Sequence, residues 1–195
     1  GVFSMDGFIA PLDEITALAA KYDALVHIDE CHATGFLGAT GRGSAEVKGV
    51  LEKIDIITGT LGKSLGGAMG GFVAASQPVI DLLRQRARPY LFSNSLAPSV
   101  AAGSLKALEI AQQADDRRAL LSRHTERFRN GLAEAGFELL PGSTPIIPVM
   151  LHDARKAQDM AVALDARGVY VAGFFFPVVP KGKARIRTQM SAALT

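Results

Sequence analysis

A lysine among glycines is the residue of this sequence best suited to covalent chemistry. Lys63 lies in "TGTLGKSLGG", residues 58–67, directly after an apolar run. The Gly62-Lys63-Ser64 triplet resembles the end of a nucleotide-binding P-loop, but a P-loop needs a glycine five positions before Gly62, where this sequence has Ile57. The spacing excludes a P-loop and leaves two interpretations, a lysine that attacks a carbonyl carbon and a lysine in an ordinary turn.

A second polar cluster, "HIDECH" at residues 27–32, contains two histidines, two carboxylates and a cysteine. Along an extended strand, His27, Asp29 and Cys31 would share one face, with His32 on the other. Zinc sites usually take ligand pairs from short turns, so this spacing does not favour a metal site and we predict none. We expect His27 to be a packed strand histidine and Cys31 a small buried side chain.

Asp29 and Lys63 together suggest a particular cofactor. A carboxylate at the end of an apolar strand is unfavourable unless a cation or hydrogen bonds compensate its lost hydration. A lysine in a nearby glycine-rich turn could be partly desolvated, which favours its uncharged, nucleophilic form. In pyridoxal phosphate sites a lysine holds the cofactor as a Schiff base and an acid keeps the pyridine nitrogen protonated. Purely structural roles in a turn remain open on this pattern alone.

The predicted elements place both clusters at the ends of strands. The runs "ALVHID", residues 24–29, and "IDIITGT", residues 54–60, read as strands, and Pro11 begins an amphipathic helix before them. Their alternation with helical stretches predicts an α/β fold with a largely parallel sheet. Open α/β sheets bind ligands at the carboxyl ends of their strands, so this edge is the expected site.

The pattern changes after about residue 112, and we expect residues 1–112 and 113–195 to belong to different domains. A long charged helix opens the second part, and it precedes short apolar runs and another helix, as in a small α+β domain. The predicted elements are a helix over 115–136, strands within 137–140, 146–151 and 168–174, and a helix over 153–167. In the last strand, within "KGKARIRTQM", Arg185 and Arg187 share one face.

Composition narrows the partners to small molecules. The 195 residues are 48% hydrophobic and carry 21 basic and 19 acidic side chains, a formal charge of +2 without a long single-sign run. This charge balance does not indicate a basic patch that would bind nucleic acid or a membrane surface. The single cysteine excludes an internal disulfide, and the absence of a leader or long apolar stretch favours a cytoplasmic protein. The chain opens at Gly1 in mid-pattern, so we expect a fragment.

Five motifs together resemble the α-oxoamine synthase family of pyridoxal phosphate enzymes. In order along the chain they are "GVFSMDG", "IDECHATGFLG", "TGTLGKSLGG", "RQRARPYLFSNSLAP" and "FFFPVVPKGKARIRTQMSAA". The resemblance covers essentially the whole chain and implies a fold type I, aspartate aminotransferase-like transferase without its N-terminal part and extreme C-terminus. Residues 1–112 would be part of the large cofactor-binding α/β domain, and residues 113–195 part of the small C-terminal α+β domain.

The resemblance also implies roles for individual residues. Lys63 would form the Schiff base and later remove a proton from the substrate. Asp29 would pair with the pyridinium nitrogen and His32 with the phenolic oxygen of the ring. Thr60 would bind the phosphate, and Ser4 falls at another cofactor-contacting position. Cys31 departs from the family, which commonly has alanine or serine there.

Three further positions follow from the same resemblance. Ser93 and Asn94 would reach the phosphate of the cofactor in a neighbouring subunit, because sites of this family lie at a homodimer interface. Arg187 would hold the substrate carboxylate, a task that suits a planar bidentate donor. The residue pattern alone does not choose between Arg185 and Arg187; the resemblance favours Arg187.

The implied reaction is the condensation of glycine with acetyl-CoA to 2-amino-3-oxobutyrate and CoA, and its reverse in threonine degradation. "RPYLFSNSLAP" and "PVVPKGKARIRTQMSA" favour this member of the family. The alternatives are a sister enzyme of the type that makes 8-amino-7-oxononanoate from a longer acyl thioester, and an inactive fragment that retains part of the site.

Overall fold

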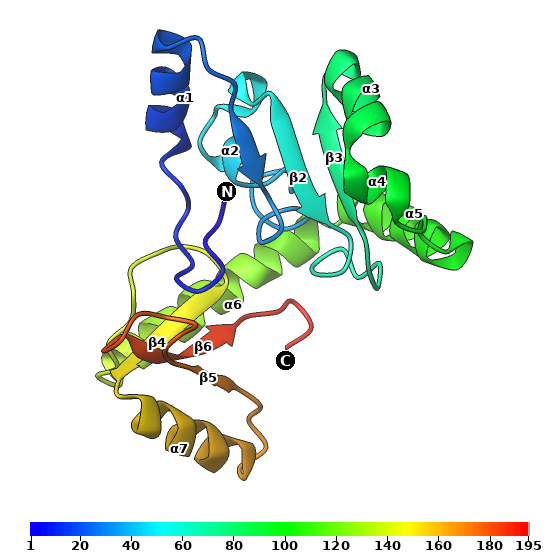
Figure 1. The fold of residues 1–195 in the computed structure, drawn as a ribbon. Helices are drawn as coiled ribbons and strands as arrows, with labels where there is room; N and C mark the ends of the chain where they lie inside the picture. The colour runs from blue at the N-terminus through cyan, green and yellow to red at the C-terminus, as the bar shows by residue number, and fades with distance from the viewer. Residues whose placement is uncertain (195) are drawn as a thin grey trace. The chain divides into compact units, whose positions relative to one another are not determined.

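The computed structural model in Figure 1 describes residues 1–194 and divides into two compact units. The first contains Gly1–Val2 and Ala10–Asp115, and the second contains Phe3–Ile9 and Asp116–Thr195. The short segment 3–9 thus belongs with the second unit, although the sequence led us to expect residues 1–112 in one piece. Long-range hydrogen bonds explain this membership, because Gly7 O accepts from Thr144 Oγ1 at 2.8 Å and Ser4 O from Arg187 Nη1 at 2.9 Å.

The sheet of the first unit has three strands in the order β1-β2-β3. They are β1 (His27–Asp29), β2 (Ile56–Thr60) and β3 (Gly71–Ala75). β1 and β2 are parallel, whereas β2 and β3 are antiparallel. The predicted largely parallel sheet is therefore wrong for the described strands. The glycine loop after β2 returns the chain directly into β3, and a direct return makes the neighbour antiparallel because a parallel neighbour requires a long crossover.

Short helices complete the first unit. Its helices are α1 (Leu12–Lys21), α2 (Ser44–Val47), the 3-10 turn η1 (Leu51–Lys53), α3 (Gln77–Arg86), α4 (Arg88–Phe92) and α5 (Pro98–Gln112). Pro11 is the residue before α1 rather than its first residue. One apolar cluster joins the start of α1 to β1 and α2, and it consists of Ala10, Leu12, Val26, Ile28, Ala45 and Val50.

β1 is shorter than the predicted strand over residues 24–29. Only Ile28 of its three residues is buried, whereas His27 and Asp29 are exposed on the other face. Val26 N instead donates to Asp55 Oδ2 at 2.7 Å, so a side chain takes the place of a ladder bond before β1 begins. The expected packed histidine at position 27 is therefore wrong.

The second unit contains an antiparallel sheet in the order β4-β6-β5. Its strands are β4 (Ile146–His152), β5 (Ala172–Phe174) and β6 (Ala184–Gln189), and its helices are α6 (Asp115–Glu134) and α7 (Ala154–Asp165). α7 contacts β5, β6 and β4. The two helices lie close to their predicted ranges. The predicted strand in 137–140 reduces to a single bridge between Leu139 and Val149.

Residues 1–194 include no helix with both the length and the apolar character that crossing a membrane requires.

Candidate active site

The two polar clusters follow neighbouring strands, as the sequence predicted. Asp29 ends β1 and lies in register with Thr58 of the parallel strand β2. β2 ends at Thr60, and the glycine loop that carries Lys63 follows it. Parallel pairing brings the carboxyl ends of the two strands to the same edge of the sheet. The lysine loop and the acid are therefore held by the same pair of strands.

Three hydrogen bonds hold the Asp29 carboxylate. Its Oδ1 accepts from Cys31 N at 2.9 Å, and its Oδ2 accepts from Cys31 Sγ at 3.2 Å and from Thr58 Oγ1 at 3.3 Å. Partial burial raises the pKa of Asp29, but the hydrogen bonds lower the pKa by a larger amount. The net pKa therefore lies below its usual value. Asp29 is therefore an anion at neutral pH, as a partner of a protonated ring nitrogen must be.

Cys31 is half-buried and interacts with Asp29, so the predicted small buried side chain is wrong. Burial, together with the hydrogen bond to the Asp29 carboxylate, raises the pKa of the Cys31 thiol. The thiol therefore keeps its proton at neutral pH and donates it toward Asp29.

Lys63 lies beside His32. The Lys63 Nζ is 3.1 Å from His32 Nε2. His32 lies in a turn beyond β1, where Ala33 N and Thr34 N both donate to Glu30 O at 3.0 Å. This turn ends the strand alternation that we assumed for residues 31 and 32. The structure thus brings together two residues that the sequence separates by 31 positions.

The glycine loop closes on itself and is attached to the turn that carries His32. Gly67 N donates to Leu61 O at 2.7 Å, and Ser64 Oγ donates to Thr34 O at 2.5 Å. A Cβ atom on Gly67 would lie 2.4 Å from Ser104 Oγ and 2.9 Å from Leu61 O, so only glycine fits at this close approach. The bond from Ser64 to the neighbouring turn holds Lys63 next to His32.

Thr60 is engaged within the same loop. Its hydroxyl donates to Gly70 O at 3.1 Å and accepts from Gly62 N at 3.2 Å. A hydroxyl has one hydrogen, so the predicted donation to a phosphate requires that hydrogen to leave Gly70 O. Thr60 is half-buried at the end of β2.

Ser93 and Asn94 lie in the irregular segment between α4 and α5, and both are exposed. Their predicted contact with a neighbouring subunit's cofactor stays a prediction.

Arg187, the predicted carboxylate-binding residue, lies on β6 in the second unit. Its Nη1 donates to Ser4 O at 2.9 Å, and its guanidinium lies 5.1 Å from the centroid of the Phe174 ring. Burial lowers the pKa of Arg187, which nevertheless remains a cation. Ser4 contacts Arg187 through its backbone carbonyl, and its side chain is half-buried.

Arg185, on the same face of β6, has a structural role. It is 3% exposed, forms an ion pair with Asp6, and donates from Nη1 to Met5 O at 3.0 Å and from Nε to Lys183 O at 3.0 Å. The Arg185 guanidinium is therefore bound by other groups of the same chain. Arg187 is the more accessible of the two arginines, and its role in holding a substrate carboxylate stays a prediction.

Glu30, which the sequence offered only as part of a polar cluster, is a fully buried carboxylate. Its Oε1 accepts from Ser44 N at 3.0 Å, from Ser44 Oγ at 2.5 Å and from Ala45 N at 3.3 Å. The acid thus joins the turn after β1 to the start of α2. The sequence analysis did not identify this contact, because Ser44 is 14 residues away from Glu30.

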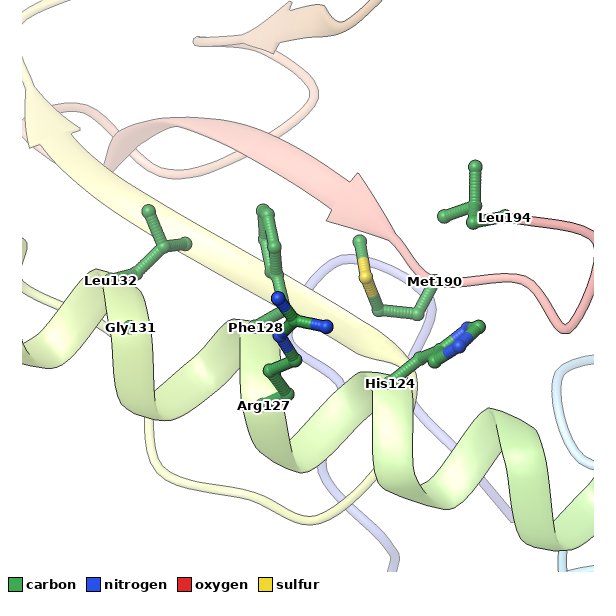
Figure 2. Close-up of a pocket in the computed structure, with 7 residues that line it drawn as sticks. All are labelled: His124, Arg127, Phe128, Gly131, Leu132, Met190 and Leu194. Atoms are coloured by element: carbon green, nitrogen blue, oxygen red, sulfur yellow. The ribbon is translucent and has the colours of Figure 1, made fainter.

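A separate groove of about 410 Å³ lies in the second unit. Figure 2 shows its lining, which includes none of the predicted site residues: His124, Arg127, Phe128, Gly131, Leu132, Met190 and Leu194. His124 Nδ1 lies 3.1 Å from Ser191 O, so α6 is joined to the segment after β6 beside this groove. Among residues 1–194, no group of three or more His, Cys, Asp or Glu side chains could hold a metal ion.

Comparison with known proteins shows the family of this chain. The model of the family "Aminotransferase class I and II" matches residues 1–195. The chain belongs to this family. It is 57% identical over 195 residues to the 2-amino-3-ketobutyrate coenzyme A ligase of Escherichia coli K12, and the match covers 100% of this chain and 49% of that protein. The chain therefore spans about half the length of the curated relatives it matches.

More distant members have the same fold. The 8-amino-7-oxononanoate synthase of Petrotoga mobilis is 45% identical over 192 residues, 98% of this chain and 49% of that protein. The structure of Sphingomonas wittichii serine palmitoyltransferase superposes with a TM-score of 0.95 at 36% identity, covering 100% of this chain and 49% of the other. A structure of SPT with PLP superposes with a TM-score of 0.96 at 38% identity and the same coverage. The fold is thus that of a fold type I aminotransferase-like enzyme.

Proposed function

We propose that the whole protein, of which this chain spans about half, condenses glycine with acetyl-CoA to 2-amino-3-oxobutyrate and CoA, and catalyses the reverse cleavage. The observation that carries this proposal is the 3.1 Å contact between Lys63 Nζ and His32 Nε2 at the strand end that also carries the Asp29 anion. The 57% identity to a ligase named for 2-amino-3-ketobutyrate supports the choice of substrates. In cells the cleavage direction would serve threonine degradation.

The residues at the strand ends fit pyridoxal phosphate. Lys63 supplies an amine for its carbonyl carbon, Asp29 an anion for its pyridine nitrogen, and His32 an imidazole for its phenolic oxygen. Thr60 offers a hydroxyl to its phosphate, and Ser4 would be a further cofactor contact. When bound, the cofactor withdraws electrons from the bond that is broken at the substrate α-carbon.

The protein side chains then have separate tasks. Lys63 would hold the cofactor through its amine, and its free Nζ would accept the α-proton of glycine. Asp29, whose pKa is low, stays ionised and keeps the ring nitrogen protonated. Arg187 holds the substrate carboxylate by two parallel hydrogen bonds.

The assembly is also a proposal. Ser93 and Asn94 are exposed, as residues that reach a neighbouring subunit must be, and they support a homodimer with shared sites. Residues 1–112 would form part of the large cofactor-binding domain and residues 113–195 part of the small domain. The protein would act in the cytoplasm. Because the chain covers about half of its relatives, we expect the 195-residue chain alone to be inactive.

The first experiment is the visible absorption spectrum of the whole protein with pyridoxal phosphate, before and after glycine. We expect an absorption band that shifts when glycine is added. The Lys63→Ala variant should lack this band, whereas the control variant Lys53→Ala, at an exposed lysine, should show it. A normal glycine response in Lys63→Ala would refute the assignment. Turnover with acetyl-CoA against longer acyl-CoA thioesters separates this function from the 8-amino-7-oxononanoate type, and turnover by residues 1–195 alone would refute the expected inactivity.

A further inference from the structure

A chain of polar contacts leads from Asp29 to an imidazole on the same face of β1. Thr58 Oγ1 lies 3.3 Å from Asp29 Oδ2 and 3.2 Å from His27 Nε2. The register of the sheet creates this chain, because Asp29 pairs with Thr58 and strand alternation puts His27 and Asp29 on one face. The threonine hydroxyl is thus the link between the imidazole and the carboxylate.

The single hydrogen of Thr58 has three acceptors within reach. They are Asp29 Oδ2, Ile28 O at 3.4 Å, and His27 Nε2 when that nitrogen carries no proton. If Nε2 is protonated, it donates to Thr58 Oγ1 and ceases to compete for the hydroxyl hydrogen. The donated bond also polarises the hydroxyl, which strengthens its own donation to the carboxylate.

We propose that His27 is a positioning residue for Asp29, acting through a directed hydrogen-bond relay in which His27 Nε2–H donates to Thr58 Oγ1 and Thr58 Oγ1–H donates to Asp29 Oδ2. The part of this proposal that concerns catalysis rests on the proposed function, in which Asp29 holds the protonated ring nitrogen. The relay itself is a property of this chain.

Packing does not account for His27. Its side chain is exposed, whereas its neighbour Ile28 is 5% exposed and belongs to the apolar core of the unit. Its ring forms a hydrogen bond with Thr58, the residue that also contacts the carboxylate. Replacing His27 should therefore change the behaviour of Asp29 without changing the fold.

Nuclear magnetic resonance of the whole protein labelled with ¹⁵N-histidine tests the relay without the cofactor. At a pH where the ring is neutral, we expect the ¹⁵N shifts of His27 to report a proton on Nε2, with His27→Gln identifying the signal. Thr58→Val should abolish this tautomer preference because it removes the acceptor. An unprotonated Nε2 in the wild-type protein would overturn the relay.

Kinetics of the loaded whole protein test the effect on Asp29. We expect His27→Leu to lower kcat about fivefold, the usual size of one lost hydrogen bond, while KM for glycine changes little. His27→Gln, which keeps an N–H donor, should recover most of the loss, and His27→Leu should add nothing to Thr58→Val because both break one relay. His152→Leu, an exposed histidine of the second unit, should leave kcat unchanged.

The outcomes separate the two proposals. Additive losses in the double variant, or no loss in His27→Leu, would overturn the positioning role. If the wild-type protein fails to turn over glycine and acetyl-CoA at all, the proposed function fails, and the tautomer measurement still decides whether the relay exists.

Discussion

The edge strands β4 and β3 of the two units differ in how far their residues are buried. In β4 every residue from Ile146 to Leu151 is buried, whereas β3 has no buried residue. Helices α3 and α4 beside β3 likewise bury none of their side chains, and Phe92 is 75% exposed. Within residues 1–194, the second unit thus covers β4, whereas the first leaves β3 and the helices α3 and α4 uncovered.

The proposed cofactor-binding residues lie in the unit with the less buried edge strand. Asp29, His32 and Lys63, which we propose to hold the cofactor, belong to the more open unit and depend on short polar contacts between neighbouring turns. Arg187 lies on β6 of the second unit, directly after the buried Ile186. The predictions below use this contrast and run from the largest expected effect to the smallest. All are made for the 195-residue chain, whose burial the comparison describes, with urea unfolding for stability and hydrogen exchange to locate the change.

The largest effect is expected in the core of the second unit. Ile186→Ala, at a side chain that is 1% exposed, should lower the free energy of unfolding by about 3 kcal/mol because it leaves a cavity. Val73→Ala in β3, at a side chain that is 41% exposed, should lower it by less than about 1 kcal/mol. Equal losses at the two sites would remove the contrast between the sheets.

In the first unit, the largest loss should come from a polar contact. Glu30→Gln weakens the bonds that the buried carboxylate accepts from Ser44 and Ala45, and we expect a loss of about 2 kcal/mol. Glu52→Gln, at an exposed side chain of η1, is the matched control and should change stability by less than about 0.5 kcal/mol. If Glu30→Gln leaves the free energy of unfolding unchanged, the stability of α2 does not depend on this carboxylate.

Helix capping sharpens the comparison further. Asp153 caps α7 by accepting from Lys156 N at 2.8 Å, whereas Ser76, at the same position before α3, makes no side-chain cap bond. We therefore expect Asp153→Ala to cost about 1 kcal/mol and Ser76→Ala close to nothing. A similar loss in both variants would show that the Ser76 hydroxyl caps α3 in solution.

The smallest effect concerns His152 at the exposed end of β4. Its Nε2 lies 2.8 Å from Glu138 Oε2, and this hydrogen bond raises the pKa of His152. A raised folded-state pKa means that the pair stabilises the protein fully below the unfolded pKa and loses this contribution as the pH rises through the folded pKa. We expect Glu138→Gln to lower the His152 pKa in an NMR titration, and an unchanged pKa would exclude the pair.

Local pattern was enough to predict that polar residues stand at the ends of two strands. Apolar runs followed by Asp29 and by the glycine loop of Lys63 predicted two neighbouring strands, and β1 and β2 are such a pair. The helices α6 and α7 were also close to prediction, because their periodicity extends over several turns. The direction of β3 and the exposure of His27 were not predicted, because each depends on how distant segments pair.

The sequence by itself determined which residue types stand after which strands, and hence that an amine, an acid and an imidazole are available for one cofactor. Only the tertiary structure decided how they are used. In the structure, Arg185 forms an ion pair with Asp6, which is 179 positions away in the sequence, and Arg187 is the more accessible of the two arginines. The tertiary structure also placed the Thr58 hydroxyl between His27 and Asp29. The physical reason is that periodicity fixes the face on which a side chain lies, whereas the atom it meets there depends on strand register and on contacts between remote segments.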